Sequence, residues 1–406
     1  MPELISIDAA LELIREQTGT CSTLRVPTLE AAGLVLAESI ASDIDSPPHD
    51  KALVDGYAVI AGDLLEGVAE LQVCDQIMAG ETPRQTVSPG TTARIMTGAP
   101  IPSGADAVVM VERTEQLSDA IVRITTERPT AGDNILTRAT SLRRDEIVLS
   151  RGTYLRAIEI GLLSEVGRSE VTVYQRPSVS VIATGNELVP ANRVPKYGEI
   201  RNSNGPMLTA LATRAGADSY PLGIGRDQPD QLERLVRDGL ERDVLLLSGG
   251  VSAGDLDLVP AVLSSLGVKQ VFHKVRLKPG KPLWFGTRGD GRRNCLVFAL
   301  PGNPVSSLVT FELFVRPALR QLAGDDKWIP NRLPARLAEP MKLAGDRATY
   351  FPGLFEPTCD GGTVHTLNWH GSADLRTLAS ANCLAVFPEG KPRFSAGELV
   401  DVQMLA

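Results

Sequence analysis

The chain has 406 residues and a formal net charge of −8. A hydrophobic content of 43% with a charged content of 22% is typical of globular proteins and argues against extended disorder. The length exceeds what one hydrophobic core usually serves, so we expect several domains. Lys and Arg are scattered and do not cluster beside aromatic residues, which argues against nucleic acid or an anionic membrane as a partner.

Cysteine and histidine spacing gives no sign of disulfides or zinc. The five cysteines form no CxxC pair, which is typical of free thiols in a reducing compartment. The four histidines form no HxH or HxxxH pair. The N-terminus lacks a basic segment followed by an apolar one, and no run approaches the roughly 18 apolar residues of a membrane helix. We therefore expect a cytoplasmic protein.

The first part of the chain predicts helices around an inserted β region. Residues 8–17 have an apolar helical face with Asp8 as the expected N-cap, and residues 28–39 predict a second helix. Helical periodicity returns at residues 156–165. Between them, short β-like runs are separated by Gly, Pro and Asp; they are residues 57–60, 71–74, 93–96, 107–111 and 121–124.

After residue 176, apolar strands alternate with helices. The strands are residues 179–183, 244–247 and 295–300, and the helices are residues 205–215, 227–240, 256–266 and a long one ending near residue 322. Strands apolar on both faces and joined by helices indicate a parallel sheet covered on both sides. The remainder is β-like. The expected fold class is multidomain α/β plus β: a central doubly wound α/β domain, an inserted β domain and a C-terminal β-barrel.

Each of these three strands ends in a glycine turn. The turns are Thr184-Gly185-Asn186-Glu187, Ser248-Gly249-Gly250-Val251-Ser252 and Pro301-Gly302-Asn303-Pro304. The carboxyl ends of parallel strands share one edge of the sheet, where ligands bind, and glycine lets backbone N–H groups approach an anion. Three ordinary strand-to-helix turns are the alternative, but polar residues beside each turn favour a ligand site.

Two further features suggest a phosphorylated or oxyanionic ligand. Lys278-Pro279-Gly280-Lys281-Pro282 places two ammonium groups on one short loop, which suits phosphate or molybdate, with a solvated basic hairpin as the alternative. Acidic residues beside the turns suit Mg²⁺, with helix capping as the alternative role. These acids are Glu187, Asp227, Asp255 and Asp257.

Taken together, the motifs resemble the molybdopterin molybdenumtransferase family, which includes the bacterial MoeA proteins and the gephyrin E domain. The matching segments, in chain order, are Asp55-Gly-Tyr-Ala, Arg94-Ile-Met-Thr-Gly-Ala-Pro, Ala107-Val-Val-Met, Thr184-Gly-Asn-Glu-Leu, Asn202-Ser-Asn, Ser248-Gly-Gly-Val-Ser-Ala-Gly-Asp-Leu-Asp, Lys278-Pro-Gly-Lys-Pro and Leu300-Pro-Gly-Asn-Pro-Val-Ser. The resemblance covers essentially the whole chain.

The resemblance implies four domains and a homodimer with the active site at the subunit interface. The domains are an elongated N-terminal domain of residues 1–46 and 142–176, whose residues 1–20 pack on the α/β domain, an inserted β domain of residues 47–141, a molybdopterin-binding α/β domain of residues 177–325, and a C-terminal β-barrel of residues 326–406. A molybdopterin adenylyltransferase is a further candidate partner.

The implied reaction inserts molybdate into adenylylated molybdopterin, uses Mg²⁺ and releases AMP. The motif match assigns catalytic roles to Asp55, Thr97, Glu187, Asp227, Asp257, Lys278 and Lys281, with Asp55 and Thr97 coming from the second subunit and Glu187, Asp227 and Asp257 as metal ligands. It assigns cofactor binding to Thr184, Gly185, Asn186, Asn202, Asn204, Ser248, Gly249, Gly250, Ser252, Pro301, Asn303, Ser306 and Ser372.

The chain departs from the family pattern at Lys51, Leu136, Ser141 and Pro352, and the last of these aligns with an arginine of the family. The departures keep open a second reading, a catalytically weakened paralogue that binds molybdopterin or nucleotide. A third reading is a molybdopterin adenylyltransferase. The extra β domains and the lysine loop favour molybdate insertion over adenylylation.

Overall fold

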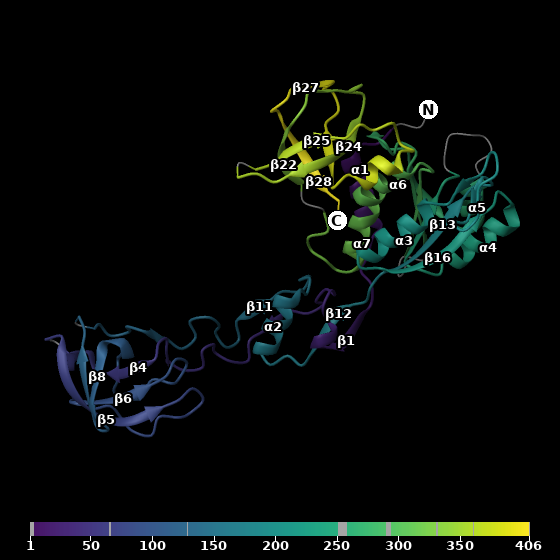
Figure 1. The fold of residues 1–406 in the computed structure, drawn as a ribbon. Coiled ribbons are helices and arrows are strands. Elements are labelled where there is room, and N and C mark those ends of the chain that lie inside the picture. Colours follow the sequence, from purple (N-terminus) through teal and green to yellow (C-terminus); the bar gives the residue numbers. More distant parts are fainter. Residues whose placement is uncertain are drawn as a thin grey trace. The chain divides into compact units, whose positions relative to one another are not determined.

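The computed structural model describes residues 4–64, 66–127, 129–250, 258–289, 294–329, 332–359 and 361–405. The chain divides into two compact units, each described by itself. Unit 1 comprises residues 1–37, 152–156 and 171–406, and unit 2 comprises residues 38–151 and 157–170. The helices and strands are labelled in Figure 1. The four domain boundaries given above stay a prediction.

The centre of unit 1 is a six-stranded sheet of order β16-β13-β17-β21-β20-β18. Its strands are β13 Ser178–Thr184, β16 Asp218–Gly225, β17 Val244–Ser248, β18 Lys269–His273, β20 Trp284–Gly289 and β21 Asn294–Leu300. Strands β16, β13, β17 and β21 are parallel, whereas β20 and β18 are antiparallel. The predicted strands 179–183, 244–247 and 295–300 correspond to β13, β17 and β21, and they are parallel as expected. The antiparallel edge follows from the short connection between β20 and β21, which leaves no room for a crossover helix.

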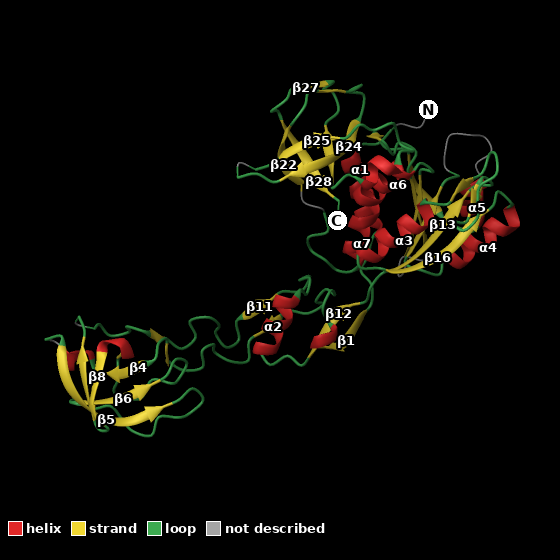
Figure 2. Ribbon diagram, viewed as in Figure 1, coloured by secondary structure: helices red, strands yellow, loops and turns green. Residues whose placement is uncertain are grey.

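Helices cover both faces of this sheet, as the doubly wound prediction requires (Figure 2). They are α3 Asn204–Arg214, α4 Pro229–Gly239, α5 Leu258–Ser265, α6 Pro304–Thr310, the π-helical turn Phe311–Val315 and α7 Arg316–Leu322. One core unites α3, α6 and α7 with the sheet, and a second unites α4 and α5 with its other face. Helix α1, Ile7–Gln17, adds Ala10 and Ile14 to the first core.

The N-terminal predictions are partly wrong. Helix α1 is confirmed, but its N-cap is Ser6, whose Oγ accepts a hydrogen bond from Ala9 N at 3.1 Å. The predicted helix at 28–39 is a single 3₁₀ turn, Thr28–Glu30. The chain then takes a positive φ of +79° at Gly33, and the following amides bond to extended backbone elsewhere in unit 1, so no helix continues.

The C-terminal strands of unit 1 form a closed barrel in the order β24-β25-β22-β28-β26, with β26 returning to β24. The bounds are β22 Arg332–Leu337, β24 Ala348–Glu356, β25 Thr363–Thr366, β26 Cys383–Phe387, β28 Leu399–Met404 and α8 Leu375–Ala379. Strand β19, Leu277–Lys278, adds to this barrel by parallel pairing that sets Lys278 opposite Thr349. The lysine loop is therefore attached to the barrel, and the expectation of a C-terminal barrel is confirmed.

The short elements of unit 1 complete the connections. They are β1 Thr23–Pro27 paired with β12 Glu170–Tyr174, β14 Leu188–Val189 paired with β15 Ile200–Arg201, and β23 Met341–Lys342 paired with β27 Arg393–Phe394. The pair β14–β15 begins directly after the first glycine turn, so it fixes the chain at the edge of the sheet.

Unit 2 is built on a six-stranded sheet of order β7-β4-β6-β5-β9-β8. Its elements are β2 Ile40–Ala41, β3 Lys51–Ala52, β4 Gly56–Val59, the 3₁₀ turn Ala61–Leu64, β5 Val68–Ile77, β6 Thr91–Ile95, β7 Ala107–Met110, the 3₁₀ turn Val111–Arg113, β8 Thr114–Ser118, β9 Ile121–Thr125, β10 Ile135–Leu136, β11 Ile147–Leu149 and α2 Ala157–Glu165. Every β-like run predicted in this part of the chain is confirmed as a strand.

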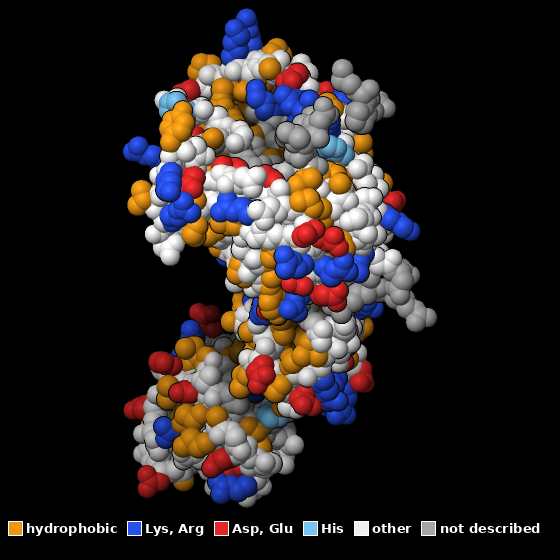
Figure 3. Space-filling model, turned by 90° about the vertical axis from the view of Figure 1, so that its right-hand side faces the viewer, with side chains coloured by type: hydrophobic (Ala, Val, Ile, Leu, Met, Phe, Trp, Pro, Cys, Tyr) orange, Lys and Arg blue, Asp and Glu red, His pale blue; other side chains and the backbone are white. Residues whose placement is uncertain are grey.

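Surface and thiol chemistry agree with the sequence. All five cysteines are free. Within the ranges that the structure describes, no helix has the length and apolar character to cross a membrane. On the face drawn in Figure 3, basic and acidic side chains are interspersed rather than gathered into one basic patch.

The packing around Phe298 predicts that shortening this side chain strongly destabilises the fold. This side chain is fully buried, and its ring centroid lies 4.8 Å from that of Phe285. We expect Phe298→Ala to lower the free energy of unfolding by about 3–5 kcal/mol, because it opens a cavity between the strands. Urea unfolding followed by tryptophan fluorescence measures this, since Trp284 is buried in the same sheet. Phe298→Leu is the control and should lower the free energy of unfolding by less. An equal decrease in both variants would contradict the packing described for Phe298.

Candidate active site

A cavity of about 740 Å³, here called the lysine cavity, lies between the lysine loop, the third glycine turn and the barrel. Its polar lining residues are Lys278, Lys281, Asn303, Ser306, Arg347, Thr349 and Ser372. Trp369 and Phe351 give it an aromatic side, with ring centroids 5.1 Å apart in an edge-to-face arrangement. The structure thus brings Ser306 and Ser372 beside both predicted lysines.

A second cavity of about 630 Å³, here called the glycine cavity, lies at the carboxyl ends of the parallel strands. Of the predicted residues it is lined by Thr184, Gly185, Glu187, Asn202, Asn204, Asp227, Ser248, Gly249, Gly250, Pro301 and Asn303. The two cavities share the wall made by Pro282 and residues 301–303. The three glycine turns and the lysine loop therefore converge, as the sequence predicts. Ser252 and Asp257 lie outside the described residues.

The lysine cavity has more cationic than anionic side chains among the described residues, because Asp346 interacts with both Arg347 and Lys278 and is the one carboxylate beside them. Neither Lys278 nor Lys281 forms an ion pair with a residue that the structure describes. Arg347 bonds to Asp346, with Nε 3.0 Å from Oδ2, and this bond holds the pKa of the Asp346 carboxyl below its usual value. Three cations against one carboxylate favour a bound oxyanion.

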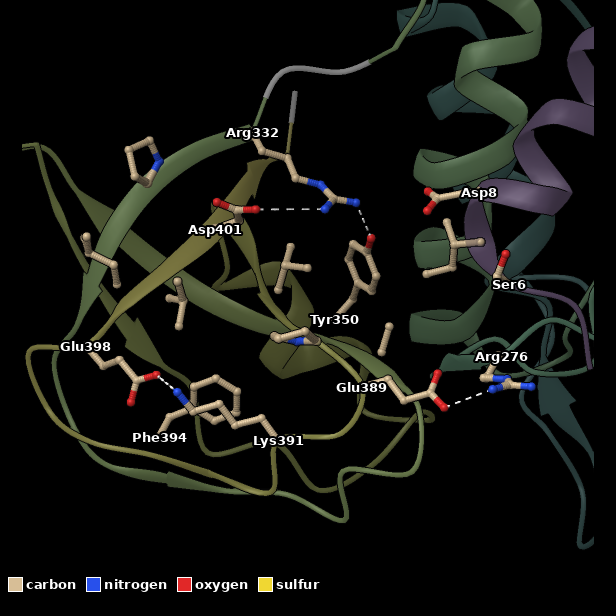
Figure 4. Close-up of a pocket in the computed structure, with 17 residues that line it drawn as sticks. Ser6, Asp8, Arg276, Arg332, Tyr350, Glu389, Lys391, Phe394, Glu398 and Asp401 are labelled. Atoms are coloured by element: carbon tan, nitrogen blue, oxygen red, sulfur yellow. Dashed lines mark hydrogen bonds and ion pairs between the residues drawn. The ribbon is translucent and has the colours of Figure 1, made fainter.

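A third cavity of about 660 Å³, here called the barrel cavity, lies between α1 and the barrel (Figure 4). Its cationic side chains, unlike Lys278 and Lys281, have partners among the described residues. There Arg276 bonds to Glu389 at 3.1 Å, and Lys391 bonds to Glu398. Arg332 donates to the hydroxyl of Tyr350 at 2.6 Å, and burial raises the pKa of that phenol. Because its cations are already paired, this barrel cavity is a poor oxyanion site, although its volume is similar.

Close backbone approach explains the glycines of the second turn. Gly249 has φ +95°, and a Cβ there would lie 2.6 Å from the carbonyl oxygen of Thr184. Gly250 has φ +67°, and its Cβ would lie 2.6 Å from Val259. A side chain at Gly249 would push the first two turns apart, and one at Gly250 would collide with Val259 of α5. The positive φ at both positions adds strain for any other residue, so glycine is the residue that fits.

Asn204 joins the second and third turns. Its Nδ2 donates to Ser248 Oγ at 2.8 Å and to the Gly302 carbonyl at 2.6 Å. A carbonyl can only accept, so this contact fixes which way the amide faces. The buried Oδ1 then has no partner among the described residues, which costs about 1–3 kcal/mol when no donor is bound. Oδ1 of Asn204 is therefore a candidate acceptor for a hydrogen bond from a ligand N–H or O–H.

The acidic residues stand on turns that hydrogen bonds hold together. Asn186 Oδ1 accepts from Asp227 N at 3.0 Å, and Arg226 donates to the Asn186 carbonyl at 2.6 Å. Glu187 folds back over Gly185, where an added Cβ would lie 2.5 Å from its Oε2. The described residues form no cluster of three or more His, Cys, Asp or Glu. Two carboxylates in one cavity fit Mg²⁺, which keeps waters and binds substrate phosphates.

In unit 2, Asp55 and Thr97 contact each other. Thr97 donates to Asp55 Oδ1 from both its N–H and its Oγ1, each at 2.7 Å. These bonds, the backbone one first, hold the pKa of Asp55 below its usual value of 3.8. Both residues are exposed, so the pair presents a fixed carboxylate to the surroundings.

Sequence reasoning missed Arg226 and Arg347. A lone arginine ahead of a strand carries no motif, and only the pairing of β19 with β24 brings Arg347 beside the lysine loop. Pro352, which aligns with an arginine of the family, is buried within β24. Arg347, five residues before Pro352, supplies the guanidinium group that lines the lysine cavity.

Fold and site together define a protein of the α/β class with a lysine-lined cavity that a β-barrel completes. Family models match residues 5–167 as the MoeA N-terminal region (domain I and II), residues 180–321 as a probable molybdopterin binding domain, and residues 334–405 as the MoeA C-terminal region (domain IV).

Relatives agree over almost the full chain. A molybdopterin molybdenumtransferase of Staphylococcus aureus is 34% identical over 98% of this chain and 95% of its own. One of Nostoc is 37% identical over 92% and 87%. The crystal structure of the molybdopterin biosynthesis protein moeA from Pyrococcus horikoshii has a TM-score of 0.85 and 29% identity, covering 99% and 100% of the two chains. The chain belongs to the molybdopterin molybdenumtransferase family, whose enzymes serve molybdenum-cofactor biosynthesis.

The Asp55–Thr97 contact predicts a measurable titration shift. Thr97→Val removes the hydroxyl bond but keeps the backbone bond, so the pKa of Asp55 should rise towards 3.8 without reaching it. Because the folded pKa is depressed, the stabilisation by this contact is present above pH 3.8 and is lost as pH falls through the folded value. Carbon-13 NMR titration of the carboxyl group measures it.

The matched control is Asp133, which accepts from Thr130 N and Oγ1, each at 2.8 Å, and also has a lowered pKa. Its titration should be unchanged in Thr97→Val. An unaltered Asp55 midpoint would show that the hydroxyl bond is absent in solution.

Proposed function

We propose that this protein inserts molybdate into adenylylated molybdopterin with Mg²⁺-dependent release of AMP. Membership of the family supports the reaction class. One observation carries the assignment of the site: a cavity whose two lysines form no ion pair with a described residue shares a wall with a glycine-lined cavity that holds two carboxylates. The first suits an oxyanion, and the second suits a phosphorylated ligand beside a divalent cation.

The lysine cavity is the proposed molybdate site. Lys278, Lys281 and Arg347 would offset the dianion's charge, and the hydroxyls of Ser306 and Ser372 would donate to its oxygens. Ser306 is 5% exposed at the start of α6, so it is held rigidly. Gly280 lets the lysine loop pass close to Leu277 and Thr310, where an added Cβ would lie 2.8 Å from each.

The glycine cavity is the proposed site for the phosphorylated part of the substrate. Backbone N–H groups of the glycine turns suit phosphate oxygens. Asn204 Oδ1, which has no described partner, would accept a hydrogen bond from a ligand N–H or O–H. Thr184, Asn202 and Ser248, which line this cavity, are further proposed contacts of the pterin and nucleotide. Asn186 is proposed as well, on the turn that its side chain ties to Asp227.

Glu187 and Asp227 are the described residues that would hold Mg²⁺, with Asp257 as the third proposed ligand. A bound Mg²⁺ supplies charge stabilisation at the phosphoanhydride. Lys278 and Lys281 would stabilise the negative charge that develops on the phosphate oxygens as the phosphoanhydride between the pterin phosphate and AMP is cleaved. Arg226 keeps the Asn186 turn in place and thereby orients both acids.

A homodimer with a shared active site is the proposed assembly, in which Asp55 and Thr97 of one copy serve the other copy's cavities. Their exposed, fixed carboxylate supports this role. A molybdopterin adenylyltransferase is the proposed source of the substrate, and the free thiols support a cytoplasmic location.

A weakened, binding-only paralogue is the second candidate, motivated by the departures named above. Two of them, Lys51 and Leu136, lie opposite each other in the β3–β10 pair. Next to them Arg138 keeps an ion pair with Asp45 at 2.6 Å, so this segment is still anchored. An adenylyltransferase is the third candidate, and the lysine cavity argues against it because adenylylation needs no second oxyanion site.

Lys281→Ala tests the proposed molybdate site. Losing one charge-assisted bond of about 1.5–3 kcal/mol should lower molybdate-dependent AMP release by about 10- to 150-fold in kcat/KM. The assay uses purified protein, adenylylated molybdopterin, molybdate and Mg²⁺. Lys391→Ala is the matched control, because Lys391 is paired with Glu398 in the barrel cavity and should leave turnover unchanged.

The same assay separates the candidates. Binding without AMP release would support the weakened paralogue, and formation of adenylylated molybdopterin from ATP would support the adenylyltransferase. Equal turnover in Lys281→Ala and wild type would remove the lysine loop from the site.

The shared-site assembly predicts a light-scattering mass of two chains, about twice 43.4 kDa. Asp55→Ala should reduce turnover while Asp133→Ala, in the same unit, should not. Mixing Asp55→Ala with Lys281→Ala subunits should restore part of the activity, because a mixed dimer contains one intact site. A monomer with full activity would contradict the shared site.

A further inference from the structure

Ser372 reaches the lysine cavity on a tight turn of the barrel, residues 370–374. The amide of Asp374 donates to the Gly371 carbonyl at 3.0 Å and closes this turn, and Gly371 takes φ +111°. Ser372 then makes two bonds across to the α/β domain. Its Oγ accepts from Asn303 Nδ2 at 2.7 Å, and its carbonyl accepts from Val305 N at 3.0 Å.

These two bonds matter because Asn303 and Val305 stand at the start of α6. The Val305 N–H is one of the amides that a helix leaves without an internal partner. The side chain of Asn303, the N-cap, makes no capping bond and is used on Ser372 instead. The position of Ser372 is therefore coupled to the helix start that also carries Ser306.

The carboxylate of Asp374 holds both ends of the turn. Oδ1 accepts from Thr377 N at 3.0 Å, and Oδ2 accepts from Thr377 Oγ1 at 2.6 Å. Oδ2 also accepts from the backbone N–H of His370 at 3.2 Å. The bonds from Thr377 hold the pKa of this carboxyl well below its usual value, so it is ionised at neutral pH.

Capping of α8 alone does not require this arrangement. An N-cap needs one bond to a backbone N–H within the first turn, which the bond from Thr377 N already supplies. The additional bond to His370 N spans the residues on either side of Ser372. That bond fixes the turn in place and contributes nothing to the helix.

We propose that Asp374 is a positioning residue of the oxyanion site, which acts by holding Ser372 against the start of α6. The inference rests on the proposed function for the role of Ser372, but the positioning itself is independent of catalysis. It adds Asp374, which contacts neither cavity, to the residues that molybdate binding depends on.

Amide hydrogen exchange tests the positioning without any substrate. In Asp374→Ala, the Val305 amide should exchange about tenfold faster, because its acceptor is no longer held. The Ser307 amide, which donates to the Asn303 carbonyl at 2.9 Å within α6, is the internal control and should be unchanged. Ser372→Ala keeps the carbonyl acceptor and should also leave Val305 unchanged. Unaltered Val305 exchange in Asp374→Ala would overturn the proposal.

A double-mutant cycle tests the consequence for molybdate. Asp374→Ala should raise the half-saturating molybdate concentration about tenfold with little change in kcat, as should Ser372→Ala. The double variant should be no worse than Ser372→Ala, because both changes remove the same contact. Fully additive losses would overturn the proposal in favour of general destabilisation. Faster Val305 exchange with no change in molybdate saturation in either single variant would instead count against the proposed function.

Asp374→Asn tests the bond to His370 N independently of the N-cap bond of α8. The amide keeps an oxygen for Thr377 N but presents an N–H to the backbone N–H of His370, so the cap survives and that bond is lost. The imidazole of His370 also contacts Asp374 Oδ2, with Nδ1 at 3.2 Å, so all variants of this comparison carry His370→Ala, which prevents the new amide from bonding to the ring. We expect molybdate saturation close to that of Asp374→Ala, with thermal stability close to that of His370→Ala alone. Saturation in Asp374→Asn equal to that of His370→Ala alone would show that the cap alone suffices and would overturn the proposal.

Discussion

The parallel pairing of β19 with β24 is the contact on which the candidate site depends. It is only two residues long, yet it sets Lys278 opposite Thr349 and so attaches the lysine loop to the barrel. Without it, Arg347 would not be held beside the lysine loop. A second link, from Ser372 to Asn303 and Val305, closes the other side. These two hydrogen-bonded links define the lysine cavity, and barrel residues such as Tyr350 and Leu384 support it by packing into the core of the α/β domain.

The pairing of cationic side chains distinguishes the lysine cavity from the barrel cavity as a candidate anion site. The lysine cavity and the barrel cavity have similar volumes and both contain three cationic side chains among their lining residues. In the barrel cavity these cations already bond to Glu389, Glu398 and the Tyr350 hydroxyl. In the lysine cavity both lysines lack such partners within the described ranges. The two cavities differ little in volume, but they differ in whether their cationic side chains already have partners.

The sequence predicted the parts of the fold that rest on local pattern. Apolar strands followed by glycine turns identified the sheet edge, because close approach at Gly249 and Gly250 leaves glycine no alternative. Residues 28–39 have helical periodicity, but a positive φ at Gly33 and extended pairing override it. Arg347 could not be found, because its place depends on pairing between strands far apart in the chain, in which Leu277 lies opposite Ala348.

The orientation of one buried amide has a consequence for which ligands the glycine cavity rejects. The amide nitrogen of Asn204 is committed to Ser248 and the Gly302 carbonyl, so the side chain cannot rotate to offer a hydrogen without breaking both bonds. A molecule that turned a lone pair towards Oδ1 would set two electron-rich oxygens or nitrogens face to face. At the proposed site, Asn204 would therefore favour heterocycles that present a hydrogen to Oδ1 over similar ones that present a lone pair there.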